Sequence, residues 1–129
     1  MIELANGELL YPILPLSYKE TIQGQQREIF EFHFICDDTG ENGYKWEDIR
    51  VYYKDPSPFN DIIFYEDSLD ENGNKIFLSE HLHFIIPVSF NEKSIDGQNR
   101  LILKLAQMSE IEIVQKEQGD VLTALLQGV

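Results

Sequence analysis

The hydrophobic period of the sequence changes within residues 98–129, and this change constrains the fold more than any other feature. Leu101, Leu103 and Leu105 recur at every second position, as on a strand. From residue 109 the apolar positions recur every three or four residues, as on one face of a helix. The sequence therefore predicts a β-rich body over residues 1–108 and a C-terminal amphipathic helix over residues 109–129.

The predicted helix must cover its apolar face against its own domain or against a partner. Part of this face follows the alternating three- and four-residue steps of a coiled-coil seam, with Gln118 as a polar position. Gly119 costs about 1 kcal/mol relative to alanine in a helix, so a kink or break at this residue is an alternative. Packing in cis on the body and docking on a partner or a second copy both remain open. The interaction residues that we predict are Ile111, Val114, Gln118, Val121, Leu122, Leu125 and Leu126.

The body is predicted to be mainly antiparallel β-sheet that opens with a hairpin. Asn6 and Gly7 form a strong hairpin-turn signal between strands over residues 2–5 and 8–14. In the strand over residues 27–36, the phenylalanines at 30, 32 and 34 share one face. Pro12 and Pro15 each remove a backbone donor, which suits an edge strand or the end of a strand.

The middle of the chain contains one ambiguous segment. Residues 44–54 fit a helical stripe and also a strand alternation, and the acidic Glu47 and Asp48 near a first turn favour a short helix. Hairpin-type turns and strands make up the remainder. The other strands are predicted over residues 59–66, over 76–90 with a break near Pro87, and over 99–108, with turns at 37–43, 70–74 and 96–97. The fold class is therefore α+β, with one short mid-chain helix and one C-terminal helix.

Length and composition are those of a single globular domain. The chain has 129 residues, 43% of them hydrophobic, and Cys36 is its one cysteine, so no internal disulfide can form. The N-terminus has no basic region of a secretory signal, and no apolar run reaches the length of a membrane span. We expect synthesis in the bacterial cytoplasm, with later packaging into a virion left open.

The formal net charge of −13 is the main compositional anomaly. It disfavours direct binding to nucleic-acid phosphates and to anionic membranes. Solubility through self-repulsion explains such a charge, and so does mimicry of nucleic acid by an inhibitor of a host enzyme. Mimicry needs a dense carboxylate array, whereas the acids are scattered along this sequence.

No residue pattern predicts an enzyme, a cofactor or a bound metal. His81 and His83 lie two apart, and a zinc site would need His33 or Glu80 as a further ligand; a solvent-facing strand is the alternative. Residues 67–75 loosely match a calcium loop, but the first and twelfth ligand positions fall on serines, so a turn is the better interpretation. Cys36 precedes two acids that raise its pKa, and we expect a small core residue. Nucleophile-elbow and phosphate-loop motifs do not occur in the sequence.

Three blocks carry a resemblance. They are IELANGELLYP at residues 2–12, IQGQQREIFEFHF at 22–34 and NRLILKLAQMSEIEIVQKEQGDVLTALL at 99–126. In these blocks the chain resembles small proteins of the tail and baseplate gene modules of phages and prophages of Gram-positive bacteria. The resemblance implies a structural role and no active site. We therefore expect a non-enzymatic tail or baseplate structural or assembly protein, whose predicted helix docks on a tail protein or on a second copy. The acidic inhibitor is the alternative.

Overall fold

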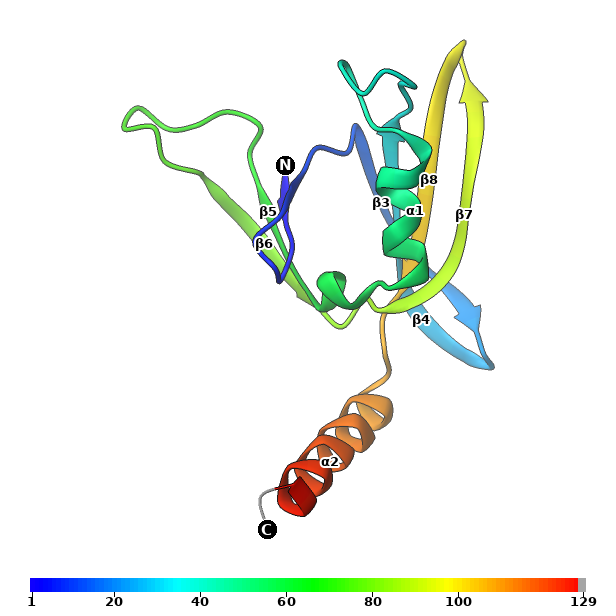
Figure 1. Ribbon diagram of the computed structural model, residues 1–129, viewed down its shortest axis with the longest axis vertical. Helices are drawn as coiled ribbons and strands as arrows, with labels where there is room; N and C mark the ends of the chain where they lie inside the picture. Colours follow the sequence, from blue (N-terminus) through cyan, green and yellow to red (C-terminus); the bar gives the residue numbers. More distant parts are fainter. Residues whose placement is uncertain (128–129) are drawn as a thin grey trace.

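Two four-stranded antiparallel sheets form the body of the protein (Figure 1). The computed structural model describes the backbone of residues 1–127 and the side chains of residues 1–120. One sheet has the strand order β2-β1-β5-β6 and is called here the short-strand sheet; the other has the order β3-β4-β8-β7 and is called the long-strand sheet. The α+β fold with a mid-chain helix and a C-terminal helix is confirmed.

The short-strand sheet consists of β1 (Ile2–Glu3), β2 (Leu9–Leu10), β5 (Asp61–Tyr65) and β6 (Phe77–Leu82). The long-strand sheet consists of β3 (Leu14–Ile22), β4 (Gln25–Ile35), β7 (Ile86–Ile95) and β8 (Gln98–Ala106). The helices are α1 (Trp46–Lys54), the 3₁₀ turn η1 (Ser57–Asn60) and α2 (Glu110–Gln127).

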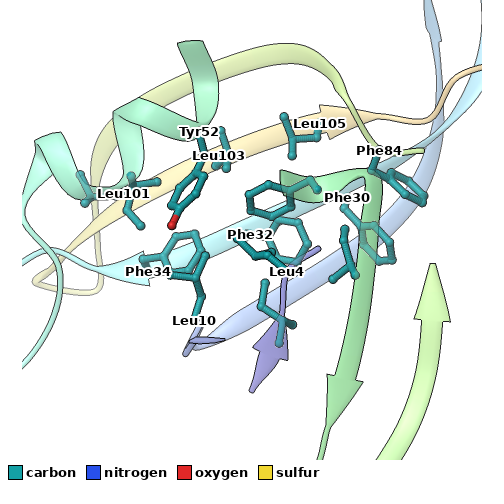
Figure 2. Close-up of a cluster of buried hydrophobic side chains, with 14 residues drawn as sticks. Leu4, Leu10, Phe30, Phe32, Phe34, Tyr52, Phe84, Leu101, Leu103 and Leu105 are labelled. Carbon is teal, nitrogen blue, oxygen red and sulfur yellow. The ribbon is translucent and has the colours of Figure 1, made fainter. Parts of the chain in front are cut away.

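Alternating apolar residues of the two central long strands build the core. β4 pairs antiparallel with β8, so that Phe32 lies opposite Leu103 and both are fully buried. Because side chains on a strand alternate between faces, the three phenylalanines of β4 and three leucines of β8 point to the same side. Figure 2 shows them meeting Leu4 and Leu10 from the short-strand side and Tyr52 of α1. The core therefore lies between the two sheets, with α1 beside it.

The ambiguous segment over residues 44–54 is a helix. The Asp48 carboxylate accepts a hydrogen bond from the Lys45 backbone N–H at 3.0 Å, which satisfies a donor at the start of α1. Ile49 and Tyr52 face inward and are buried. Two prolines at 56 and 58 then prevent the helix from continuing and begin the short η1 turn.

The opening hairpin at Asn6-Gly7 is confirmed, but the predicted strand over residues 8–14 is wrong. β2 ends at Leu10, the chain crosses to the other sheet at Tyr11–Ile13, and β3 begins at Leu14. β3 was not predicted; it pairs with β4 through a turn at Gln23 and Gly24, both with positive φ. Pro12 supplies no backbone N–H, which is compatible with a strand ending at this crossing.

The predicted break near Pro87 lies slightly earlier in the structure. β6 ends at Leu82, and His83 has a φ of 69°, which turns the chain toward β7. Pro87 lies inside β7, where the pairing register shifts between Pro87 and Ser89. A proline is tolerated here because β7 is an edge strand.

Helix α2 projects away from both sheets (Figure 1). It runs through Gly119 without interruption, so the alternative of a break at this glycine is wrong. Apart from its chain neighbours and the nearby helix backbone, no described atom lies within 4 Å of where a Cβ of Gly119 would stand. Among the helices that the structure describes, none has the length and apolar character of a transmembrane span.

Candidate protein-interaction site

The start of α2 is fixed to the body by a buried arginine. The Arg27 residue on β4 is only 4% exposed. Its guanidinium donates to the backbone carbonyls of Ile22 at 3.0 Å and of Gln107 at 3.2 Å, and it forms a two-pronged ion pair with Glu112 of α2. A buried guanidinium needs such partners because its desolvation costs several kcal/mol. We call Arg27 and Glu112 the helix clamp.

Glu112 also closes the first turn of α2. Its carboxylate accepts the Ser109 backbone N–H at 2.8 Å, while Ser109 Oγ accepts the Glu112 N–H at 3.3 Å. This reciprocal arrangement is a capping box. Two hydrogen bonds lower the pKa of Glu112 to about 2: the one from Arg27 has the larger effect, and the one from the Ser109 backbone has the smaller. The carboxylate is therefore charged at neutral pH and holds the helix start in place.

The segment before α2 is tied to both sheets. The Gln107 N–H donates to the Glu28 carbonyl on β4, and the Met108 N–H donates to the His83 carbonyl beyond β6, both at 2.9 Å. The Gln107 side chain adds a hydrogen bond to the Leu82 carbonyl at 2.9 Å. With the helix clamp, these contacts fix where α2 leaves the body.

Three of the predicted interaction residues are exposed on α2. Ile111 is 70% exposed and Val114 is 50% exposed. With Glu110 and Gln115 they line a shallow hollow of about 300 Å³. Gln118, the predicted polar seam position, is exposed as well. The side chains of the other four predicted residues, Val121, Leu122, Leu125 and Leu126, lie outside the described part of the chain.

The structure does not bring the three histidines together. His33 lies on β4 with Nε2 2.7 Å from Glu31 and Nδ1 3.3 Å from the Arg100 guanidinium. His81 lies 3.0 Å from Ser79 Oγ, and His83 lies 3.1 Å from the Asn60 side-chain oxygen. Within the described residues, no three histidine, cysteine or carboxylate side chains are grouped as metal ligands.

The alternative to the zinc site was a strand face turned to solvent, and for His81 this alternative is wrong. Its ring packs edge-on against Phe30, with centroids 4.9 Å apart, and against Phe64 at 5.3 Å. Burial lowers the pKa of His81. The histidine is thus part of the aromatic packing between the two sheets.

Two other predicted features have ordinary structural roles. In the loosely calcium-like loop, Asp70 Oδ1 accepts the backbone N–H groups of Asn72 and Asn74 at 2.8 Å, and Gly73 has a φ of 79°, as a turn requires. Cys36 is half-buried against the core, and its thiol donates to Glu92 at 3.0 Å. Burial and the neighbouring carboxylates raise the pKa of Cys36 to about 11, which keeps the thiol protonated.

Sequence reasoning missed both the helix clamp and a polar network on the long-strand sheet. In that network the Tyr18 hydroxyl donates to Glu31 at 2.8 Å, and Glu31 contacts His33, which is only 5% exposed. Burial raises the pKa of Glu31, but the hydrogen bonds from His33 and Tyr18 outweigh it and lower the pKa overall. Only the role of Glu112 at the helix start had a readable signal, because Ser109-x-x-Glu112 is a capping-box pattern; its pairing with Arg27 had none.

A larger surface hollow, of about 470 Å³, lies beside the crossing between the sheets. Its lining residues are Tyr11, Ile13, Ile35, Asn42, Gly43 and Tyr44. This lining includes no carboxylate, imidazole or thiol; its ionisable groups are the phenols of Tyr11 and Tyr44, and the Tyr44 hydroxyl accepts the Tyr11 backbone N–H at 3.0 Å.

Comparison of the chain with protein-family models, with curated proteins and with solved structures gave no significant match.

Proposed function

We propose that this chain is a non-enzymatic structural or assembly protein of a phage or prophage tail or baseplate, and that it acts by docking α2 onto another protein. Two things support the proposal. One is the resemblance of its N-terminal, β4 and C-terminal blocks to proteins of tail gene modules. The other is the exposed apolar stripe of α2, which here means the side of the helix that carries Ile111 and Val114.

The exposed stripe is the observation that carries the proposal. Single apolar residues on a surface are common and need no explanation. Here two β-branched residues lie three positions apart on the same side of one helix, and that helix projects from the body (Figure 1). Burying a wholly exposed side chain of this kind contributes about 1.5–3 kcal/mol, so covering the exposed 70% of Ile111 and 50% of Val114 contributes a proportionate part of this to binding.

The helix clamp supports a docking role as well. A helix on a loose tether loses conformational entropy when it binds, and this loss weakens the complex. Arg27 and Glu112 hold the first turn of α2 relative to the long-strand sheet. The stripe is thus presented in a defined direction before any partner arrives.

The proposal is tested by particle assembly. In a phage or prophage that encodes this chain, Ile111→Asp should abolish the formation of complete particles, because a carboxylate replaces an apolar contact. Val51→Asp is the matched control, since Val51 is 51% exposed on α1 and receives the same change away from the stripe. Normal assembly with Ile111→Asp, or equal loss with Val51→Asp, would contradict docking through α2.

A shortened chain gives a second test if the cut is placed with the clamp in mind. Ending the chain at Met108 would remove Glu112 and leave Arg27 buried without its carboxylate. Ending it after Gln115 keeps the clamp, Ile111 and Val114, and removes Gln118 and the predicted interaction residues after it. This chain should stay folded, by circular dichroism and thermal unfolding, and should co-purify with tail proteins more weakly than the full chain.

A further inference from the structure

The charges around the stripe of α2 are not evenly distributed. Glu110 and Glu117 lie seven residues apart, which is about 10 Å along the helix, and both border the same side of the stripe. Both are exposed, and within the described part of the chain neither has a salt-bridge partner. The stripe thus has one border with two free carboxylates.

The other charged residues of this part of α2 are already engaged. Glu112 is held by Arg27, and Lys116 pairs with Asp120 at 3.6 Å on the far side of the helix. The second border of the stripe carries Gln115, which is uncharged. Lys116, the one cation of α2, is therefore not placed to meet Glu110 or Glu117 of a neighbouring helix.

These charges argue against a second copy as the occupant of the stripe. If two copies paired their stripes, the Glu110 and Glu117 border would face either the uncharged border or the same acidic border of the other helix. Neither arrangement supplies a cation, and like charges that face each other across a helix pair are unfavourable. The net charge of −13 on each chain adds long-range repulsion between copies.

We infer that the occupant is an amphipathic helix of a different protein, with an apolar stripe bordered by two lysines or arginines about 10 Å apart. The seam spacing of Ile111, Val114 and Gln118 is that of helix-on-helix packing. The two cations would pair with Glu110 and Glu117, and the apolar stripes would cover each other. This inference rests on the proposed docking function and specifies its partner.

The test uses the full chain and two synthetic helix-forming peptides that share one leucine and isoleucine stripe. One peptide carries lysine along the borders of its stripe and the other carries glutamate. Fluorescence anisotropy measures the binding of each peptide at low and high salt. The lysine-bordered peptide should bind, more weakly at high salt, and the glutamate-bordered peptide should bind at least tenfold less tightly.

Paired variants separate the local charges from the overall charge. The double variant Glu110→Gln/Glu117→Gln should weaken binding of the lysine-bordered peptide by about threefold to tenfold, as expected for two exposed ion pairs. The control Glu41→Gln/Glu71→Gln removes the same charge from two exposed loop positions and should leave binding unchanged.

The outcomes also separate this inference from the proposed function. Three outcomes would each overturn the inference about the partner. They are equal effects of the two double variants, tight binding of the glutamate-bordered peptide, and no binding of either peptide. If Ile111→Asp still removes particle assembly in any of these cases, docking through α2 stands and only the partner's chemistry is wrong. If the lysine-bordered peptide binds Ile111→Asp as tightly as the original chain, the stripe is not the contact and both proposals fail.

Discussion

At the residue scale, Arg27 is a charged residue that the fold places in its buried part. Its side chain is 1% exposed, so its charge depends on the carbonyls of Ile22 and Gln107 and on the Glu112 carboxylate. Removing one partner from a buried ion pair leaves the other without compensation, and this usually costs more than the pair itself contributes. The position of α2 and the stability of the body are therefore coupled at one contact.

Glu112→Gln should lower the free energy of unfolding by about 1.5–3 kcal/mol, the usual value for a hydrogen bond to a charged group. The amide still reaches Arg27 but no longer neutralises it. Glu110→Gln, two residues earlier in the same turn, is the control and should cost less than about 1 kcal/mol, because it only removes a favourable charge near the helix N-terminus. Urea unfolding of both variants measures the difference; equal losses would mean that the clamp does not hold the body.

The clamp also predicts a pH dependence. The pKa of Glu112 is about 2 in the folded chain and 4.5 in its ordinary state. A folded-state pKa below the unfolded value means that this stabilisation is present above about pH 5 and is lost as the pH falls toward 2. The stability difference between the original chain and Glu112→Gln should therefore shrink steadily over this range in urea unfolding. A difference that stays constant down to pH 2 would show that Glu112 does not titrate there.

Gly43 gives a packing prediction at the same scale. A Cβ at this position would lie 2.5 Å from the Ile35 carbonyl oxygen, closer than any real contact. Gly43→Ala should therefore shift the backbone and lower the free energy of unfolding by about 1–3 kcal/mol. Thermal unfolding would detect this as a lower midpoint, and an unchanged midpoint would mean that the loop between β4 and α1 adapts freely.

At the element scale, the strands with one clear apolar face were predictable. The alternation in β4 and β8 placed Phe32 and Leu103 in the core correctly, since a strand with one face on the core and one polar face alternates in this way. β3 was missed although Leu14, Leu16, Tyr18 and Ile22 alternate on one face, because Pro15 suggested that a strand ends there. Its turn with β4 uses Gln23 at a φ of 54°, a conformation that glutamine seldom adopts and that does not mark a turn in a sequence.

The candidate site was predictable only in part, for a related reason. Periodicity identified the stripe of α2, because Ile111 and Val114 are neighbours along one helix. The contact between Arg27 and Glu112 joins residues 85 positions apart, and nothing in local pattern indicates it. Likewise, the spacing of His81 and His83 suggested a shared ligand, whereas the turn at His83 gives the two rings separate partners.

Helix α2 itself can be strengthened without touching the stripe. Gly119 lies inside the helix with open space around its Cβ position, and glycine costs about 1 kcal/mol more than alanine in a helix interior. Gly119→Ala should raise helical content, measured by far-ultraviolet circular dichroism, without weakening assembly. A fall in assembly would indicate that a partner approaches this side of α2 closely.

At the scale of the whole molecule, the net charge is −13, and the two functions that the sequence left open use this charge differently. They therefore differ in how their binding affinity responds to salt. An inhibitor that mimics nucleic acid would bind through many carboxylates, so its affinity would fall steeply with salt and would ignore Ile111→Asp. Docking through α2 involves two carboxylates and an apolar stripe, so salt should weaken it modestly and Ile111→Asp should abolish it. Titration of any captured partner at several salt concentrations, with both chains, distinguishes the two functions.

The central claim is that the apolar stripe of α2 serves a partner and is not needed by the body. The most direct test is the free energy of unfolding of Ile111→Asp, measured in urea beside the original chain. Because Ile111 is 70% exposed and an acid is tolerated in the first turn of a helix, the two values should agree within about 0.5 kcal/mol. A loss of about 2 kcal/mol or more would show that Ile111 packs on its own domain, and the docking account would then be wrong.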